Sequence, residues 1–553
     1  MSYKIVRIHP KDNVLVALSD LQKGESIEFE NKTYILQNDI PGKHKFASEE
    51  LKAGTKVYMY GVLVAKTLSD IPKGGALTTQ NIAHAAGSYD VEAGKTEYNW
   101  EAPSVSEWKG RTFNGFHRTD GKVGTANYWL VIPLVFCENR NVGVLKELLE
   151  NSLGYGRKET GNFDIGTLIS SYQKGASIEE VLANDILVSS EEEKKKNSLF
   201  PNVDGIKFLT HNGGCGGTRE DAEVLCRLIA GYINNPNVAG ATVLSLGCQN
   251  AEDKLLEQAI KDLYPNSEKP LYILEQQSST SEKDFISEAV KKTFGGLMMA
   301  NELKRKPASL DKLVIGLECG GSDGFSGISA NPVLGGVSDL VVALGGSTVL
   351  AEFPELNGVE QELINRCVED EAATKFSNLM ATYNTRAEEV GSGFHANPSP
   401  GNIKDGLITD AMKSAGAAKK GGTSPVQDVL DYTEPVKKPG LSLLCTPGND
   451  VESTTGLAGS GTNMILFTTG LGTPTGNPVC PVLKVSSNSK LFNRMNDIMD
   501  FNTGEVIEGK VTIEQSAGAL LDLIVKVASG DAESKAMRLG QDDFIPWKRG
   551  VSL

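Results

Sequence analysis

From about Thr112 onward, short apolar runs of strand length alternate with longer segments that have helical periodicity. The apolar runs are nearly continuous, which is typical of strands that are buried on both faces of a sheet. Strands that are separated by helices favour parallel pairing, because each helix returns the chain to the end where the previous strand began. This part of the sequence therefore predicts an α/β fold built on parallel sheets.

The predicted strands of this region share an apolar run that is bounded by turn residues, and they cover 128–136, 205–210, 241–246, 271–274, 312–317, 340–344, 348–352, 441–444, 464–467 and 482–485. Helical periodicity predicts helices over 219–233, 251–264 and about 281–293. The basic, polar stretch 301–310 interrupts the pattern and is typical of a boundary between two α/β domains.

The first 87 residues have a different pattern. Short apolar or alternating runs at 4–8, 14–18, 34–36 and 57–65 are separated by turn signals such as Lys23-Gly24 and Pro41-Gly42. These runs predict a small antiparallel β module. Residues 88–108 lose apolar periodicity but hold Trp100 and Trp108, which indicates a linker that packs through its aromatic side chains.

The net charge of −15 restricts the partners of the chain. Nucleic acid is not expected, since neutralising phosphates needs a basic surface. An anionic ligand requires local cations that act against the overall negative field. The N-terminus has no apolar signal core and no run of 18 apolar residues occurs, so no membrane association and a cytoplasmic location are expected.

Three of the eight cysteines directly follow predicted strands within glycine-rich loops: Cys215, Cys248 and Cys319. Loops beyond the carboxyl ends of parallel strands form ligand sites, so these cysteines are candidate ligands of one metal or cluster. Thiolates select iron, zinc or copper(I) over magnesium and calcium, and three of them leave a coordination position open. The residues alone leave open the alternative of separate packing roles. Cys137, Cys226 and Cys367 lie within apolar runs and are expected to serve packing.

Two histidines and one lysine pair complete the set of candidate groups. His44 and His211 lie in glycine-flanked polar loops, where an imidazole suits proton transfer or metal binding. The Lys419-Lys420-Gly421-Gly422-Thr423 segment is either a carboxylate-binding loop or a solvated helix end. Neither a Walker A motif nor a G-x-S-x-G elbow occurs, and the loop 320–327 lacks the spacing of a dinucleotide fingerprint.

Several longer motifs resemble the altronate/galactarate dehydratase family over nearly the whole chain and in the same order. The most specific is Cys319-Gly-Gly-Ser-Asp-Gly-Phe-Ser-Gly-Ile-Ser-Ala-Asn-Pro332. The others are 120–127, 211–217, 246–249, 397–402, 420–428 and 468–474, together with Gly42-Lys-His-Lys-Phe-Ala47 in the N-terminal module. Two positions depart from the family pattern, Asn212 in place of threonine and Gln249 in place of glutamate. The order and spacing look closer to altronate than to galactarate dehydratases.

The resemblance implies an α/β chain with a small N-terminal β-clip (SAF) domain at 1–87 and a linker at 88–108. It further implies a central α/β domain at 109–305 that forms a homodimer, and a C-terminal Rossmann-like parallel-sheet domain at 306–553 that is catalytic. The implied activity is dehydration of a sugar acid to a 2-keto-3-deoxy acid, and the expected substrate is D-altronate. The implied cofactor is Fe²⁺, with Mn²⁺ as a substitute. Our own hypothesis is that thiolates hold the iron, either as a single ion or as an iron–sulfur cluster.

This chemistry assigns expected roles to the candidate residues. Loss of water from a 2,3-dihydroxy acid needs a base for the C2 proton, an acid for the departing C3 hydroxyl, and a metal to stabilise the charge that forms. We expect Cys215, Cys248 and Cys319 to hold the metal, and His44, Lys45 and His211 to move protons. We expect the substrate to contact Asp323, Ser326, Lys420 and Thr423.

Other functions remain open from the sequence alone. The same scaffold is compatible with an aldarate dehydratase or a sulfolactate-type lyase. Outside the lyases, the alternatives are an NAD-dependent oxidoreductase and a carbohydrate-binding protein without turnover.

Overall fold

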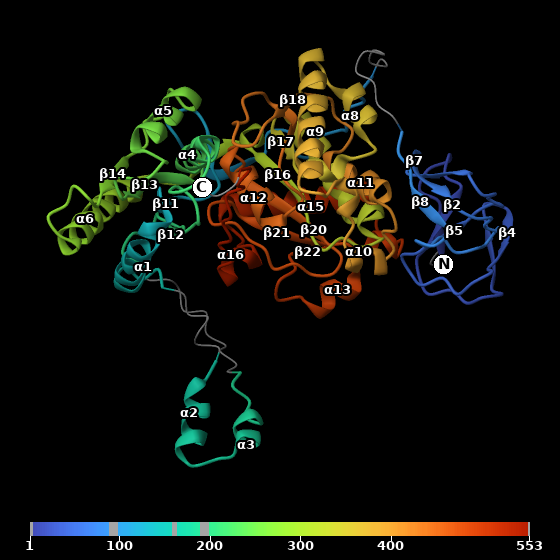
Figure 1. Cartoon of the computed structure of the whole chain (residues 1–553), viewed down its shortest axis with the longest axis horizontal. Coiled ribbons are helices and arrows are strands. Elements are labelled where there is room, and N and C mark those ends of the chain that lie inside the picture. The colour runs from blue at the N-terminus through green and yellow to red at the C-terminus, as the bar shows by residue number, and fades with distance from the viewer. Residues whose placement is uncertain (1–3, 88–97, 157–162, 188–197, 551–553) are drawn as a thin grey trace.

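Three structured parts follow one another in the computed structural model, which describes residues 4–87, 98–156, 163–187 and 198–550. Positions 88–97 of the predicted linker lie outside the described residues. The C-terminal part occupies the middle of the molecule, with the N-terminal module on one side and the central part on the other (Figure 1). No helix among the described residues has the length and apolar character needed to cross a bilayer.

The N-terminal module consists of short antiparallel strands, as the sequence predicts. They are β1 (Ile5–Val6), β2 (Val14–Ala17), β3 (Ser26–Phe29), β4 (Lys32–Ile35), β5 (Lys45–Ala47), β6 (Lys56–Met59), β7 (Val62–Thr67) and β8 (Ile82–His84). They pair in the orders β1-β2-β5, β3-β4 and β6-β7-β8. The start of β5 contacts the C-terminal part, where Lys45 Nζ donates to the carbonyl oxygen of Gly406 at 2.6 Å.

The central part is built on a four-stranded parallel sheet of order β12-β11-β13-β14. Its strands and main helices are β11 (Tyr128–Pro133), α1 (Asn139–Leu153), β12 (Gly205–Phe208), α4 (Arg219–Asn234), β13 (Val238–Ser245), α5 (Asp253–Leu263), β14 (Leu271–Glu275) and α6 (Glu282–Asn301). Two short helices lie between α1 and β12, α2 (Ile165–Gln173) and α3 (Ile178–Leu182). A small antiparallel sheet of β9 (Thr112–His117), β10 (Val123–Gly124) and β15 (Lys306–Ser309) precedes the C-terminal part.

The C-terminal part contains a seven-stranded parallel sheet of order β18-β19-β17-β16-β20-β21-β22. Its strands are β16 (Val314–Cys319), β17 (Ser347–Leu350), β18 (Val426–Leu430), β19 (Gly440–Leu444), β20 (Met464–Thr469), β21 (Val482–Ser486) and β22 (Phe501–Asn502). Its helices are α7 (Ala330–Ala343), α8 (Glu360–Arg366), α9 (Asp370–Glu389), α10 (Pro400–Lys404), α11 (Asp410–Ala417), α12 (Asp450–Gly459), α13 (Ser489–Arg494), α14 (Gly504–Ile507), α15 (Ile513–Ser529) and α16 (Lys535–Leu539). From β16 the chain first adds β17, β18 and β19 on one side of the sheet and then adds β20, β21 and β22 on the other side. The sheet therefore has a topological switch point between β16 and β20.

One predicted strand is wrong. Residues 340–343 continue helix α7, and Leu344 is its C-cap. The run is apolar all round because α7 packs on the sheet with one face and on α15 with another, so its composition resembles that of a buried strand.

The linker and the two α/β parts are held together by close contacts. Trp108 is buried and its indole N–H donates to Asp522 at 3.1 Å, while Trp100 donates to Thr423 at 3.2 Å. Helix α4 approaches α12 so closely that a Cβ on Gly231 would lie 2.0 Å from the carbonyl oxygen of Gly459. The central and C-terminal sheets therefore share one apolar core across this contact.

Two adjacent glycines of α6 give a matched test of this packing. A Cβ on Gly296 would lie 2.1 Å from the ring of the fully buried Trp129, whereas a Cβ on Gly295 would meet nothing within 4 Å. Overpacking costs about 1–3 kcal/mol, so we expect Gly296→Ala to lower the unfolding midpoint in heat and in urea. Gly295→Ala should raise the midpoint slightly, because alanine stabilises a helix by about 0.5–1 kcal/mol relative to glycine. Equal midpoints for the two variants would contradict this packing.

Candidate functional site

Charged side chains gather beyond the carboxyl ends of the central strands of the seven-stranded sheet. Cys319 is the last residue of β16, and Glu352 and Glu355 follow β17 in and around a short 3-10 helix, Phe353–Leu356. Lys413 comes from α11, and Lys420 from the 3-10 turn Ala418–Gly421 directly after it. All five side chains are at least nine-tenths buried. This is the edge of the sheet at which open parallel sheets bind their ligands.

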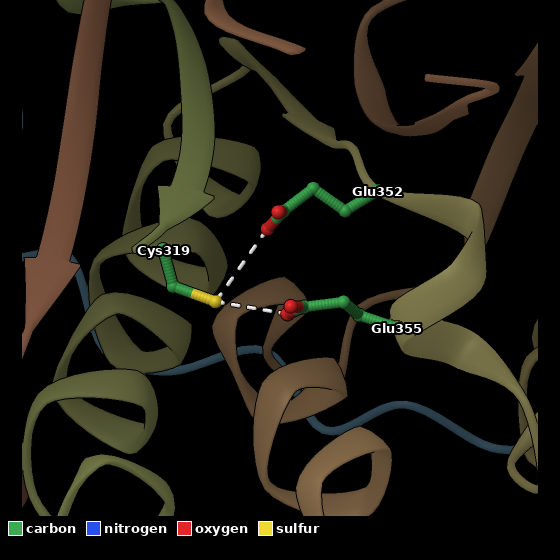
Figure 2. Close-up of side chains that lie close together, drawn as sticks. All are labelled: Cys319, Glu352 and Glu355. Atoms are coloured by element: carbon green, nitrogen blue, oxygen red, sulfur yellow. Dashed lines mark hydrogen bonds between the residues drawn. The ribbon is translucent and has the colours of Figure 1, made fainter. Parts of the chain in front are cut away.

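Cys319, Glu352 and Glu355 point toward one another (Figure 2). The Cys319 thiol donates to Glu355 Oε2 at 3.0 Å and lies 3.5 Å from Glu352 Oε2. One ligand atom from each of the three lies within 4.8 Å of the others. A thiolate and two carboxylates at this spacing form a donor set for a divalent cation such as iron, zinc or manganese.

The ammonium groups of two lysines offset the negative charge of this group. Lys420 Nζ lies 2.8 Å from Cys319 Sγ and 3.0 Å from Glu352 Oε2, and Lys413 Nζ lies 2.7 Å from Glu355 Oε1. Burial lowers the pKa of Lys420, but Cys319 and Glu352 outweigh that effect and raise the pKa well above its ordinary value. Burial also lowers the pKa of Lys413, but Glu355 outweighs it and the pKa is raised, so both lysines stay protonated at neutral pH.

The carboxyl groups differ in charge, although the glutamates are all buried. Burial raises the pKa of Glu355, but the Lys413 and Lys420 ammonium groups outweigh it and lower the pKa to about 2. Burial, followed by repulsion from Glu352, raises the pKa of Glu318 well above its ordinary value, so Glu318 stays protonated. Burial and the charges of Glu352 and Glu355 raise the pKa of nearby Asp450 to about 7.

Two buried oxygens of the site lack a hydrogen-bond partner among the described residues, Glu318 Oε1 and Glu352 Oε1. The second oxygen of Glu318 accepts from Ser453 at 2.6 Å, and that of Glu352 contacts Lys420. An unpaired buried oxygen costs about 1–3 kcal/mol, and a shared proton or a bound cation would relieve that cost. Glu318 and Glu352 also share a side-chain hydrogen bond, so the proton of Glu318 relieves part of this cost, and a bound cation would relieve the rest.

The backbone of Glu352 is strained at this point. Its φ of 69° and ψ of 67° are left-handed, which is uncommon outside glycine and asparagine. Its amide donates to the buried Thr446 hydroxyl at 2.8 Å, which helps to hold the conformation. Strain of about 1–3 kcal/mol often marks functional positions, and here it turns the carboxylate toward Cys319.

A cavity of about 570 Å³ adjoins the charged group. Asn397 lines it and also bonds to both Glu355 and Lys413, so the cavity wall reaches the group directly. The lining also includes three cationic side chains, Arg386, Lys548 and Arg549. Arg549 is paired with Asp431, which lines the same cavity, and Arg386 is paired with Glu220, so part of this positive charge is already balanced within the chain.

The two candidates from the N-terminal module lie on the C-terminal part. His44 Nε2 contacts the carbonyl oxygen of Lys404 at 3.1 Å, and burial lowers the pKa of the imidazole. Lys45 is completely buried, and burial lowers its pKa to about 7 against the opposing effect of Asp323. The adjacent Lys43 forms ion pairs of 3.0 Å with both Asp323 and Asp405.

The predicted substrate contacts divide into three groups. Lys420 belongs to the charged group. Asp323 and Ser326 are buried and bonded to each other at 2.9 Å, and Asp323 also accepts from Ser487, so both side chains hold the loop after β16. Thr423 lies elsewhere and bonds to Asp339, Tyr98 and Trp100.

The three predicted sulfur ligands are split between the two sheets. Cys319 ends β16 of the seven-stranded sheet, whereas Cys215 and Cys248 follow β12 and β13 of the four-stranded sheet. The expected convergence of all three at one edge is corrected accordingly, because the chain forms two separate parallel sheets. Cys137, expected to serve packing, is instead exposed.

His211 lies near Cys215, in the wall of a second cavity of about 380 Å³. Its Nε2 bonds to the carbonyl oxygen of Pro133 at 2.7 Å, and its Nδ1 accepts from the Gly213 amide at 3.1 Å. Burial lowers the pKa of this imidazole, so the neutral form is favoured. Both nitrogens are thus engaged in holding the loop.

The sequence analysis did not identify Glu352, Glu355, Lys413 or Asn397 as site residues. A signal was present for the two glutamates, since they directly follow a buried strand at the carboxyl edge of a parallel sheet. Their convergence with Cys319 depends on the left-handed turn at Glu352, which sequence patterns do not reveal.

Adjacent lysines test the buried ion pairs. Lys420→Met leaves Glu352 and Cys319 without their cation, and we expect a loss of about 3–5 kcal/mol of unfolding free energy at neutral pH. Lys419 is more than one-third exposed and lies 3.9 Å from Glu362, so Lys419→Met should cost less than about 1 kcal/mol. Urea unfolding of both variants measures the difference. A loss of similar size in both would show that the buried pairs contribute no more than a surface pair.

Known proteins match the chain along its whole length. Three family models cover it in succession: the altronate/galactarate dehydratase SAF domain over residues 3–85, the D-galactarate dehydratase/altronate hydrolase second domain over 115–301, and the D-galactarate/altronate dehydratase C-terminal domain over 310–552. The altronate dehydratase of Bacillus subtilis is 34% identical over 99% of both chains, and that of Escherichia coli is 32% identical over 99% of both. The L-threo-forming galactarate dehydratase of Escherichia coli is 28% identical over 95% of this chain and 92% of its own.

These matches agree with the resemblance that the motifs carry and with the observed fold, a SAF module followed by α/β parts with a seven-stranded parallel sheet. The chain belongs to the altronate/galactarate dehydratase family and is a hydro-lyase that dehydrates a sugar acid.

Proposed function

We propose that the chain dehydrates an aldonate, D-altronate, to 2-keto-3-deoxy-D-gluconate. The observation that carries the proposal is the buried Cys319–Glu352–Glu355 group with its two lysines beside a cation-lined cavity. The relatives favour this substrate within the family, because both altronate dehydratases match over their full length at higher identity than the galactarate dehydratase.

The donor set fits a divalent metal, and we propose that Cys319, Glu352 and Glu355 hold it. The unpaired buried Oε1 of Glu352 and the mixed sulfur and oxygen donors support Fe²⁺, with Mn²⁺ as a substitute. When bound, such an ion acts as a Lewis acid that stabilises negative charge on the substrate and on the departing hydroxyl oxygen.

Protein groups supply the remaining steps of this proposal. The cations that line the 570 Å³ cavity attract the substrate carboxylate. Lys413 and Lys420 hold fixed positive charge against the anion that forms when C2 loses its proton. Lys45 is the proposed proton acceptor, since its pKa of about 7 leaves a neutral amine available near physiological pH.

The proposed homodimer is a further part of this function that rests on the family resemblance. We propose that the central domain forms the contact between the two subunits, while each charged group is assembled from side chains of one chain.

A substrate panel tests the reaction. Purified protein is incubated anaerobically with Fe²⁺ and with D-altronate, other aldonates, galactarate or sulfolactate, and the 2-keto acid formed is measured. We expect the highest kcat/KM for D-altronate, loss of turnover with a chelator, and recovery on adding Fe²⁺ or, less well, Mn²⁺. Preferential turnover of galactarate or sulfolactate would replace the proposed substrate. Full activity after chelation would contradict the proposed metal.

The dependence of kcat/KM on pH tests Lys45. Because only the neutral amine accepts a proton, kcat/KM should rise with pH through an inflection near 7 and then level off. Lys45→Met should lower kcat by about 10²–10⁴-fold and remove the inflection. Lys43→Met is the matched control: the pKa of Lys43 is raised, by Asp323 and Asp405 against the effect of burial, so the inflection should stay. An unchanged inflection in Lys45→Met would assign it to another group, such as Asp450.

A further inference from the structure

Three cysteines follow three adjacent strands of the four-stranded sheet. Cys137 comes four residues after β11, Cys215 seven after β12 and Cys248 three after β13. In the sheet order β12-β11-β13-β14, the chain leaves β11 toward β12 and then returns to β13 on its other side. These loops therefore flank the topological switch point of the sheet, where doubly wound sheets bind ligands.

Hydrogen bonds tie the three loops together. The Phe136 amide, next to Cys137, donates to the carbonyl oxygen of Gly213 at 3.1 Å. The Asn250 side chain, two residues after Cys248, donates to the carbonyl oxygen of Cys215 at 2.6 Å. Gly214 makes the approach possible: its φ is +97° and a Cβ there would lie 2.0 Å from the carbonyl oxygen of Leu134.

The sulfur atoms remain accessible although their loops are fixed. Cys137 and Cys248 are exposed and Cys215 is half-buried, whereas the other five cysteines are buried. The sulfurs of Cys215 and Cys248 lie close enough to Cys137 to act on it electrostatically.

A second observation at this edge indicates a ligand. Glu138, directly after Cys137, is completely buried, and its Oε1 has no hydrogen-bond partner among the described residues. Gln277 Nε2 lies 3.3 Å from Cys248 Sγ, as an outer donor to a ligating sulfur would.

The three sulfur atoms, in their observed positions, lie too far apart to bind one metal ion together. Two thiolates on a single zinc ion, each at about 2.3 Å, lie at most about 4.6 Å apart. Among the described residues, Cys319, Glu352 and Glu355 form the group whose ligand atoms all lie within 4.8 Å of one another. Cys137, Cys215 and Cys248 do not meet this limit, so at least two of their sulfurs lie farther apart than 4.8 Å. A cluster of several iron and sulfide ions spans a wider gap between its cysteine ligands.

We propose that Cys137, Cys215 and Cys248 ligate a [4Fe–4S] cluster with three thiolates, in addition to the metal at Cys319. The fourth iron has no cysteine ligand, and the 380 Å³ cavity that Cys215, His211 and Asn250 line lies beside the cluster. In this cluster Cys137 is the third cysteine ligand, the role that the sequence analysis gave to Cys319. The cluster is independent of which sugar acid the chain dehydrates.

Anaerobic reconstitution of the full chain with Fe²⁺ and sulfide tests the proposal. The readouts are iron and acid-labile sulfide per chain, visible absorption, and electron paramagnetic resonance of the reduced protein. We expect labile sulfide and a broad visible band in the wild type, and loss of both in Cys137→Ser, Cys215→Ser and Cys248→Ser. Cys319→Ser should keep the labile sulfide, because its sulfur belongs to the other sheet.

Two outcomes would overturn the cluster. One is a wild type that takes up no labile sulfide; the other is Cys137→Ser that keeps the full amount. Circular dichroism of the unloaded variants separates loss of the cluster from loss of fold, and substitution of the exposed Cys137 and Cys248 should leave the spectrum unchanged. Turnover in the substrate panel is measured separately, so failure of the cluster and failure of the proposed substrate give different results.

Discussion

Parallel pairing places the carboxyl ends of neighbouring strands at the same edge, and this constraint determines where the chain can assemble chemistry. Cys319 and Glu352 are 33 residues apart in the sequence, yet they meet because β16 and β17 are hydrogen-bonded neighbours. The same rule brings together the loops of Cys137, Cys215 and Cys248 on the second sheet. Each sheet has its own switch point, and the chain has placed sulfur-bearing loops at both.

Burying charge is costly, and the C-terminal site shows how the fold meets that cost. Carboxylates taken out of water need cations and hydrogen bonds around them. Lys413 and Lys420 lie seven residues apart, on α11 and the turn that extends it, so both ammonium groups reach the same group of acids. The balance is incomplete, because one of the buried acids, Glu318, stays protonated and shares a hydrogen bond with Glu352. A site that is fully neutralised by its own side chains would have little affinity for a metal ion.

The sequence predicted the architecture well because buried parallel strands and amphipathic helices leave strong periodic signals. It predicted the strand at 340–344 wrongly because a helix that is buried on several sides has no polar face. It singled out Cys319 as a metal ligand and Lys420 as a substrate contact, and these roles stay predictions, although the structure places both residues in the buried charged group. It missed Glu355, whose role depends on the left-handed backbone of Glu352, and it grouped three cysteines that belong to two sheets. Local patterns indicate which loops end strands, but only the sheet order shows which loops are neighbours.

The extended segment 547–549 joins the two halves of the molecule. Trp547 and Lys548 line both the cavity beside Cys215 and the cavity beside Asn397. Arg549 anchors this segment through Asp431, and the Trp547 amide donates to the Tyr432 hydroxyl. The segment is therefore a common partition between two chambers: displacing it to admit a molecule on one side reshapes the volume on the other.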